Sequence, residues 1–513
     1  MSSVPSGNGG EARNKLRAIV VGGSIGGLAT AAVLNNQGGW EVKVYEKSSG
    51  DLSQRGAGIF TTRPMLAYLQ KLGILSEGDD IDMGRVGVPL DERWLLDREG
   101  EKIYTYAGIS QISGSWSTVY SHCRASMNPE NYHQGVEVES YRESEEGVEV
   151  IFKDNARRPE RCDVLVGADG SSSKIRSLLI DEIARKLDPL TTENVLGRME
   201  VDRNLQDIFQ AVDSTGTVVK NARGEGSDGA TTRENSGNHN FIELKQQLLK
   251  KLESSRRPNF ANYVAYRFVL PEKSVVAINP HWFHTFCFWA SRDEIFVLCY
   301  PMVGYEKNTQ AGDRLWNTVC YVKPTKEQQR TIRDASSAAL AVDNATLQSL
   351  RSTLEKFLPT ELVKLYLGDL SQKMCHPVSE FHMPLATNCS RVVLIGDAAT
   401  THRPHPAVGT TKAIEDAIAL GRCLQGKTFP RPPATTLKPA VVHTDTIAAG
   451  LLQYNNERVP KQRLAYEHGR TVGACLFGDR ADNVEELDLA LLKKAVRLTA
   501  RYSDDVKCEI ESN

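Results

Sequence analysis

Small residues at a fixed spacing are the first candidates for chemistry in this sequence. Gly22, Ser24 and Gly27 take the positions of G-x-G-x-x-G directly after a short apolar run, residues 17–21. In a strand–turn–helix unit this spacing turns the chain tightly and aims the first N–H groups of a helix at a diphosphate. Glu46 ends the next apolar run, where a carboxylate can accept a hydrogen bond from a ribose hydroxyl. The predicted dinucleotide-binding residues here are Gly22, Gly23, Ser24, Ile25, Gly26, Gly27 and Glu46.

This first segment also fits a strand–helix–strand unit that binds nothing. Ser24 replaces the second glycine of the pattern, and its side chain crowds the approach of a diphosphate to the backbone. The segment alone therefore leaves a dinucleotide site and a plain structural unit as alternatives.

Two later segments repeat the arrangement of an apolar strand that ends in glycine and aspartate. Residues 162–166 run into Gly167-Ala168-Asp169-Gly170, and a helix is expected to start among the following serines, with Arg176 in its early turns. The alternative is an ordinary strand–turn–helix connection.

The third segment, residues 391–395, runs into Gly396-Asp397. Ligands of open α/β sheets bind at such carboxyl ends of strands, so Asp397 is placed to accept hydrogen bonds from ribityl hydroxyls. Gly409 opens a helix whose N-terminal amides could face a flavin ring. The alternative for Asp397 is a turn or helix cap.

Together the three segments resemble the signatures of the class A flavoprotein monooxygenases, the para-hydroxybenzoate hydroxylase-like family. The signatures are GGSIGG with Glu46, GADG with Arg176, and GDAA with the loop from Pro404 to Gly409. Within the family the chain looks most like the 2,6-dihydroxypyridine 3-hydroxylase branch. The residues that support the branch are the GGSI turn, 55–59 (RGAGI), Ser115-Trp116, 263–267 (YVAYR) and Arg403-Pro404-His405.

The resemblance implies a fold and a reaction class. It implies an α/β protein in which a Rossmann-type FAD-binding domain is joined to a mixed β-sheet substrate domain and to C-terminal helices. FAD would be reduced by NADH or NADPH as a transient electron donor, and reaction with O₂ would give a C4a-hydroperoxide that hydroxylates a phenol- or hydroxypyridine-like small-molecule substrate. The alternatives are a flavin epoxidase or oxidative-rearrangement enzyme of secondary metabolism, and a degenerate FAD-binding protein without oxygen transfer.

The resemblance also implies roles for single residues. The residues that it places at FAD, beyond the first glycine turn and Glu46, are Arg55, Asp169, Arg176, Asp397, Pro404 and Gly409. Arg55 fits a surface arginine equally well. His405 is the candidate catalytic acid or base, because an imidazole beside a flavin titrates near neutral pH. Structural hydrogen bonding in a proline-rich loop is the alternative for His405 and the favoured interpretation for His402.

Some positions depart from the family pattern. An arginine that contacts FAD is common near the position of Trp116, and here the nearest arginine is Arg124. Thr400-Thr401 stand where the family usually has His-Pro after GDAA. Residues 181–259 have no recognisable family counterpart. These departures motivate the degenerate-protein alternative.

Composition excludes several other classes of function. The net charge is −2, so no basic field suggests nucleic acid. The ten cysteines are scattered without C-x-x-C or metal-type spacing, which is typical of reduced thiols in a cytoplasmic protein. No signal peptide and no transmembrane segment are expected, because no apolar run approaches ~18 residues. The oligomeric state stays open, with a homodimer as one option.

The elements that must position these residues follow from periodicity and breakers. We expect a disordered N-terminus over 1–14, a discontinuous FAD-binding domain from 15–180 and 380–425, an atypical and partly flexible insertion over 181–259, a substrate domain over 260–379 and C-terminal helices over 440–513. Ser214–Asn240 is expected to form the flexible part of the insertion, because it is rich in Gly, Ser, Asn and charge. Pro460 is expected to kink or split the helix over 447–476.

Overall fold

The computed structural model describes residues 15–50, 52, 58–75, 87–187, 233–304, 310–334, 340–368, 374–427, 446–478 and 488–499. The predictions for residues 1–14, for Arg55 and for residues 214–232 lie outside the described residues.

A parallel sheet carries the predicted dinucleotide-binding segments. Its strand order is β17-β10-β1-β2-β6, and every pairing is parallel. The strands are β1 (Leu16–Val21), β2 (Trp40–Glu46), β6 (Tyr132–Gln134), β10 (Val164–Gly167) and β17 (Val392–Leu394). β1, β10 and β17 are hydrophobic at nearly every position because both faces of the sheet are covered. The predicted strand over 162–166 is interrupted at Asp163, and its first residue belongs to β9 (Glu160–Cys162) of a separate small sheet with β7 (Val138–Ser144) and β8 (Gly147–Phe152).

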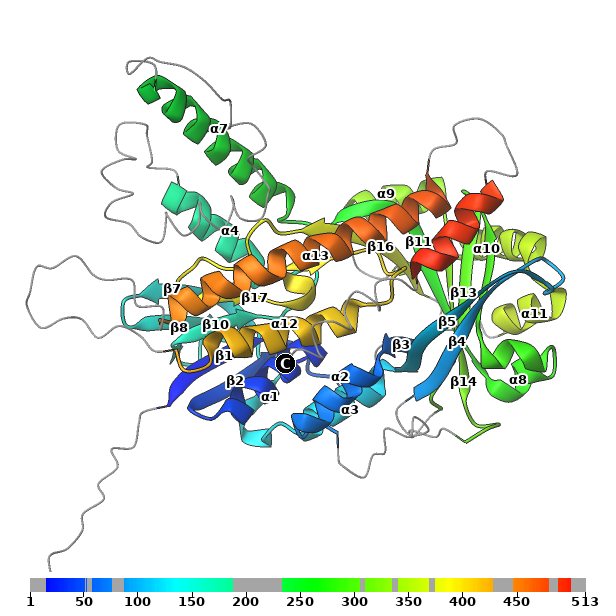
Figure 1. Cartoon of the computed structure of the whole chain (residues 1–513), viewed down its shortest axis with the longest axis horizontal. Helices are drawn as coiled ribbons and strands as arrows, with labels where there is room; N and C mark the ends of the chain where they lie inside the picture. The colour runs from blue at the N-terminus through cyan, green and yellow to red at the C-terminus, as the bar shows by residue number, and fades with distance from the viewer. Residues whose placement is uncertain are drawn as a thin grey trace, which may run out of the picture.

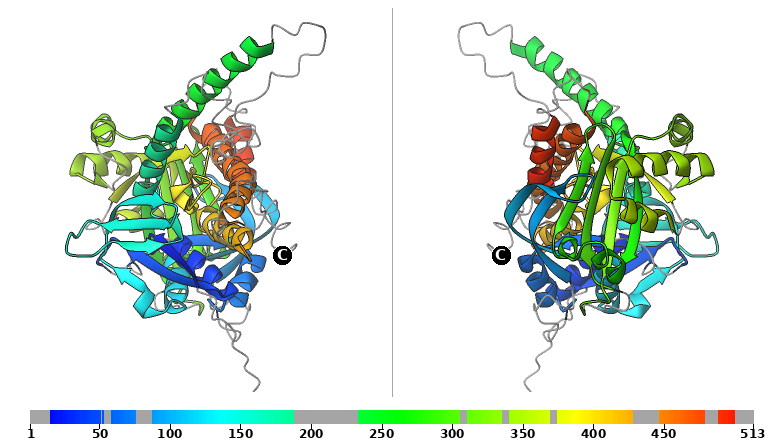
Figure 2. Two further views of the ribbon diagram at one scale, coloured as in Figure 1. Left: turned by 90° about the vertical axis from the view of Figure 1, so that its left-hand side faces the viewer. Right: turned by 90° about the vertical axis from the view of Figure 1, so that its right-hand side faces the viewer.

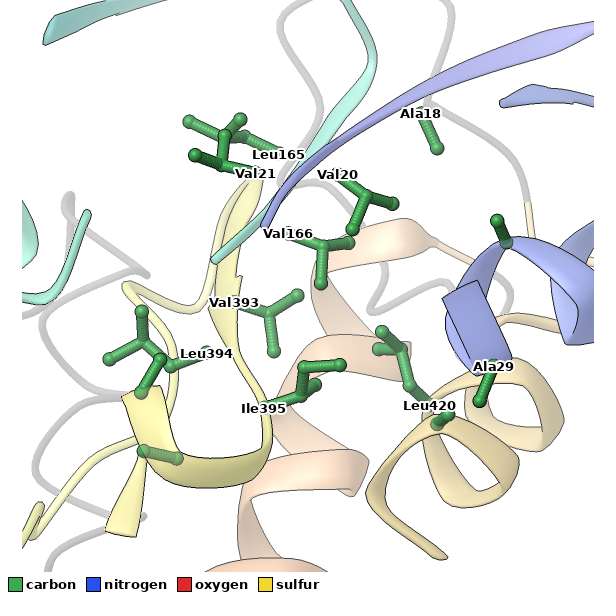
Figure 3. Close-up of a cluster of buried hydrophobic side chains, with 14 of the residues drawn as sticks. Ala18, Val20, Val21, Ala29, Leu165, Val166, Val393, Leu394, Ile395 and Leu420 are labelled. Carbon is green, nitrogen blue, oxygen red and sulfur yellow. The ribbon is translucent and has the colours of Figure 1, made fainter. Parts of the chain in front are cut away.

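Helices cover this parallel sheet and form one core with it. α1 (Ile25–Gln37) and α12 (Gly409–Leu424) pack closely, and a Cβ at Gly421 would lie 2.2 Å from Val33. Figure 3 shows Val20 of β1, Val166 of β10 and Val393 of the edge strand β17 pointing at one cluster with helix side chains. The core therefore fixes the carboxyl ends of β1, β10 and β17 relative to one another.

A second, mixed sheet of ten strands forms the other half of the molecule (Figure 1). Its order is β15-β16-β11-β14-β13-β12-β4-β5-β3, with β18 paired to β16. Only the β12–β4 pairing is parallel among its described pairings. The strands are β3 (Gly58–Thr61), β4 (Gly87–Leu96), β5 (Lys102–Ser115), β11 (Asn259–Pro271), β12 (Phe286–Ser291), β13 (Ile295–Met302), β14 (Leu315–Val322), β15 (Leu340–Ala341), β16 (Met374–His382) and β18 (Thr400–Thr401).

The remaining helices lie around the two sheets. They are α2 (Arg63–Lys71), α3 (Trp116–Ala125), α4 (Lys174–Leu187), α7 (Arg233–Ser254), α8 (Glu272–Val276), α9 (Lys326–Asp334), α10 (Asn344–Phe357), α11 (Thr360–Gly368) and α13 (Ile447–Phe477), with a further helix over 488–499. Figure 1 shows α13 running along α12 toward the second sheet as one continuous helix. Pro460 lies inside α13, so the predicted split of this helix is wrong.

The predicted fold class is confirmed, but the predicted boundaries cross structural elements. β3, β4 and β5 lie within the range predicted for the FAD domain, yet they pair in the second sheet. α4 extends across residue 181, the predicted start of the insertion. Residues 233–240, expected to be a flexible loop, belong to α7, which projects from the body in both views of Figure 2.

Candidate functional site: a dinucleotide cavity at three strand ends

A cavity of about 490 Å³ lies at the carboxyl ends of the parallel strands. This size is within the usual range of small-molecule and cofactor sites. Eight of the predicted site residues line the cavity: Gly22, Ser24, Ile25, Gly26, Glu46, Asp169, Asp397 and Gly409. The structure thus brings together residues from the three sequence-distant segments at one place.

The first wall is the turn between β1 and α1, and its glycines are required by space. Gly22 has φ +111°, and a Cβ there would lie 2.2 Å from the carbonyl oxygen of Ala168. A Cβ on Gly27 would lie 1.9 Å from the carbonyl oxygen of Gly22. Ser24 precedes α1 with extended backbone, and its side chain makes no capping hydrogen bond. The first amides of α1 therefore have no Ser24 cap, and Ser24 lines the cavity, as a diphosphate site requires.

Glu46 supports this turn as well as lining the cavity. Its Oε2 accepts a hydrogen bond from the backbone N–H of Gly23 at 2.8 Å, and its Oε1 accepts one from Ser48 at 2.8 Å. The Tyr132 hydroxyl donates to the Gly23 carbonyl at 3.2 Å. Gly23 and Gly27 are not among the lining residues, so they shape the turn from behind.

The second wall follows β10, where Asp169 is largely used by the fold. Its carboxylate accepts hydrogen bonds from Ser173 Oγ at 2.5 Å and from the backbone N–H groups of Lys174 at 2.7 Å and Ile175 at 3.2 Å. These bonds cap the N-terminus of α4, as in the ordinary strand–turn–helix connection that is the alternative for this segment. Burial raises the pKa of Asp169, and these hydrogen bonds act in the opposite direction.

Arg176 lies behind the cavity and not in its lining. Its guanidinium donates to the carbonyl oxygens of Ala398 at 3.2 Å and Ser171 at 2.6 Å, and it stacks on Phe381 at 4.0 Å. Burial lowers its pKa to about 10. Arg176 therefore supports the turn that carries Asp397 and is not in direct reach of a ligand in the cavity.

The third wall is the turn Gly396–Ala398, which presents Asp397. Gly396 has φ +57°, and its N–H donates to Asp416 Oδ2 at 2.9 Å. Asp416 is itself held by Arg458 at 2.8 Å. The Asp397 side chain is exposed, and its carboxylate accepts no hydrogen bond from the described residues. Of the other lining carboxylates, Glu46 and Asp169 are bonded within the fold and Glu137 pairs with Lys153 at 2.8 Å, so Asp397 is the one available to a ligand among the described residues.

The lining includes residues that motif reading did not single out. Lys47 and Lys174 are the cations of the lining, while Arg124, the arginine nearest to Trp116 in the sequence, packs over the Tyr132 ring at 4.0 Å. Trp116 lines the cavity and stacks on Tyr120 at 4.9 Å. Trp116 belongs to a pair that supports the family branch in the sequence, whereas Lys47 and Lys174 belong to no motif that could have predicted them.

Pro404 and His405 lie in the loop between β18 and α12 but not in the cavity lining. His405 is buried against the second sheet, where its Nε2 is 2.7 Å from the Tyr263 hydroxyl. Burial, with further contributions from Arg403 and His402, lowers the pKa of His405 to about 3. The imidazole is thus neutral at neutral pH, in contrast to the titration expected from its ordinary pKa.

The partner of His405 belongs to a longer polar chain. Arg403 makes a bidentate pair with Glu380 at 2.8 and 3.0 Å and lies over the Tyr263 ring at 5.7 Å. His402 is buried and its Nδ1 is 2.9 Å from the Arg403 carbonyl oxygen, which agrees with the structural interpretation. Tyr266, in the segment 263–267 that supports the family branch, accepts a hydrogen bond from Gln328 in the core on the opposite side of the second sheet.

The cavity fits FAD on its own geometry. Glycine turns that no larger residue could adopt, uncapped helix amides, two lysines and an available carboxylate at a strand end are what a dinucleotide needs. Asp397 would hold ribityl hydroxyls, Glu46 the adenosine ribose, and the first turn of α1 the diphosphate.

Comparison with known proteins agrees with this geometry. Residues 15–259 match the FAD binding domain family, and residues 260–339 match an FAD binding domain-like family. The 2,6-dihydroxypyridine 3-monooxygenase of Paenarthrobacter nicotinovorans is 24% identical over 413 residues, covering 79% of this chain and 81% of that protein.

Solved structures share the fold. The 2,6-dihydroxypyridine-3-hydroxylase from Arthrobacter nicotinovorans superposes with a TM-score of 0.62 and 19% identity, covering 93% of this chain and 96% of that one. HpxO from Klebsiella pneumoniae, solved with FAD and uric acid, superposes with a TM-score of 0.60 and 18% identity, covering 94% and 93%. On the three signatures, the cavity they form and these similarities, the chain belongs to the class A FAD-dependent monooxygenases.

Proposed function

We propose that the protein is an NAD(P)H-dependent hydroxylase of an electron-rich aromatic or heteroaromatic small molecule, with O₂ as the second substrate. The observation that carries this proposal is the convergence of Gly22, Asp397 and Gly409 on one cavity from three strand ends. The similarity to a dihydroxypyridine monooxygenase supports the substrate class. Bound FAD would supply the redox and oxygen chemistry, which no amino-acid side chain provides.

The protein's own residues would bind and orient the substrate and would exclude water. In the buried core of the second sheet, Phe296 and Tyr321 contact the His405 imidazole edge-on at 5.8 and 4.9 Å. We propose that the substrate ring lies beside this aromatic cluster, because aromatic side chains favour a flat apolar ring over a flexible polar substrate. We propose that His405 acts there as a neutral hydrogen-bonding group, since its lowered pKa disfavours proton uptake near neutral pH.

Two measurements test the proposal in sequence. The purified protein should be yellow with about one FAD per chain, because the cavity is built for one dinucleotide. It should then consume NADH or NADPH in the presence of a hydroxypyridine or phenol and yield a product one oxygen atom heavier. A folded, colourless protein that gains no flavin on addition of FAD would overturn the assignment at its first step.

The two alternatives predict the same cavity, and no described residue favours either. A flavin epoxidase or rearrangement enzyme would consume NAD(P)H without giving a hydroxylated ring. A degenerate FAD-binding protein would, after chemical reduction, return to oxidised flavin with O₂ without transferring oxygen to any substrate. Product analysis after a single turnover therefore separates all three.

The cellular setting follows from less direct observations. The cysteines of the described residues are buried and form no disulfide, which supports a reducing, cytoplasmic location. None of the described helices combines the length and hydropathy that crossing a bilayer requires. A homodimer stays a prediction, to be tested by light scattering.

A further inference from the structure

A second cavity, of about 280 Å³, lies between α7, β16 and α13. Lys251 of α7, His382 of β16, and Arg463 and Tyr466 of α13 are among its lining residues. It shares no lining residue with the FAD cavity. One of its walls comes from the end of α7 and the residues that follow it, Lys251 to Asn259.

The walls of this second cavity are tied together by hydrogen bonds. Ser255 Oγ lies 2.8 Å from the Lys251 carbonyl oxygen and 2.9 Å from the His382 carbonyl oxygen, which joins the end of α7 to β16. Arg256 pairs with Asp181 at 2.7 Å and so joins the same end to α4. The cavity is therefore preformed on rigid elements.

The charges that face the second cavity are mainly positive. Lys251 and Arg463 line it, and Glu467 is the acidic lining residue. Glu467 pairs with Arg463 at 2.8 Å, but these side chains are 52% and 43% exposed, so the pair is weak and Arg463 can turn to a ligand. Burial, together with Arg463, the buried Lys412 and Lys251, lowers the pKa of His382 to about 3.

A hydrogen-bonded chain fixes which nitrogen of His382 carries its proton. Gln462 Nε2 donates to Asp416 Oδ2 at 3.0 Å, so Gln462 Oε1 faces Thr400. The Thr400 hydroxyl donates to this Oε1 at 3.3 Å, and its oxygen is therefore free to accept from His382 Nδ1–H at 3.0 Å. His382 Nε2 is left as a hydrogen-bond acceptor.

We propose that this second cavity binds a phosphate-bearing small molecule. Lys251 and Arg463 would contact the anionic oxygens, and His382 Nε2 would accept a hydrogen bond from a P–OH group. A phosphate monoester offers both because its second pKa is near 6. Tyr466, which stacks on His382 at 5.9 Å, offers an aromatic wall to the rest of the ligand. The proposal stands on these residues and is independent of the oxygenase activity.

The test is calorimetric titration of the FAD-loaded protein with inorganic phosphate, ribose 5-phosphate and NADPH at constant ionic strength. Saturable binding of inorganic phosphate or ribose 5-phosphate is expected in the wild type. Lys251→Met and Arg463→Met should each weaken it about tenfold, the size of one charge-assisted contact. Lys250→Met is the matched control, because Lys250 is the exposed neighbour of Lys251 on α7. Flavin absorbance in the same samples reports whether the first site is intact.

The outcomes separate the sources of the phosphate. If NADPH competes with inorganic phosphate, and this competition is lost in Lys251→Met, the phosphate group that the second cavity binds is that of the pyridine nucleotide. Binding of ribose 5-phosphate that NADPH does not displace would identify a separate phosphorylated ligand. Both support the site. Absence of saturable binding of either phosphate probe, or equal weakening by Lys250→Met, would overturn the proposal even if the protein is an active, flavin-loaded hydroxylase.

Discussion

Replacing Asp397 by alanine should weaken FAD binding without weakening the fold. The carboxylate lines the cavity and accepts no hydrogen bond from the described residues, so its removal leaves no protein donor unpaired. The turn that carries it is held by other groups, through the Gly396 N–H bonded to Asp416 and the Ala398 carbonyl bonded to Arg176. The melting temperature of the apoprotein should therefore stay unchanged.

The size of the loss in FAD affinity follows from the ribityl hydroxyls whose hydrogen bonds Asp397 would accept. Leaving such a group buried and unpaired in the complex costs about 1–3 kcal/mol. The dissociation constant for FAD should rise about 5- to 150-fold. Asp397→Asn keeps the shape but removes the charge and half the acceptor capacity, and it should fall between wild type and Asp397→Ala.

The assay is titration of apoprotein with FAD followed by flavin fluorescence, alongside thermal unfolding of the same apoprotein. A dissociation constant within twofold of the wild type would show that Asp397 is only a turn residue. A drop of several degrees in the apoprotein melting temperature would show that the fold uses the carboxylate after all.

Three further predictions rest on neighbouring groups. Glu46→Ala should lower both apoprotein stability and FAD affinity, because the backbone N–H groups of Gly23 and Ser48 lose their acceptor, while turnover at saturating FAD stays near normal. An unchanged melting temperature together with a large loss of turnover at saturating FAD would contradict this prediction. Asp169→Ala should destabilise the apoprotein by about 1 kcal/mol through loss of the α4 cap, measured by urea unfolding, with no change refuting the capping role. The free energy of unfolding should be highest above pH 6.5 and should fall as the pH drops toward 3, because the folded state lowers the pKa of His405 and His382 to about 3 and the unfolded chain takes up these protons at higher pH. His405→Gln should reduce this pH dependence of the unfolding free energy in urea melts. An unchanged pH dependence would assign it to other groups.

Local sequence pattern was sufficient to predict where the strands end, but not which polar side chains are bonded within the fold and which are available to a ligand. β1, β2 and the start of α12 at Gly409 lie where periodicity and glycine breakers place them, because a buried strand or a helix start is specified by neighbours in sequence. Whether a carboxylate is free is decided by tertiary contacts. The Asp169 carboxylate is hydrogen-bonded to the N-terminus of the helix that follows it, and the Asp397 carboxylate is not, although both residues follow an apolar strand and a glycine.

Other features depend on partners far away in the chain. The assignment of β3–β5 to the second sheet cannot be read from their alternation, which fits any sheet with one buried face. Arg176 matches a family motif, yet it is buried under the Asp397 turn. Pro460 was expected to kink or split the helix, but it lies inside continuous α13, where Arg458 and Gln462 on either side of it both bond Asp416 of α12.

The order of strands in the parallel sheet has a consequence for biosynthesis. β17 pairs with β10 and completes the edge that presents Asp397, although Val392 emerges long after its partner Leu165. During translation the first glycine turn and β10 must therefore wait, without their flavin, until the second sheet has been made. Such non-local closure is slow and exposes apolar strand edges to aggregation. The yield of active protein should consequently depend on the supply of FAD at the moment when the last strand docks, and truncations before residue 391 should give insoluble chains.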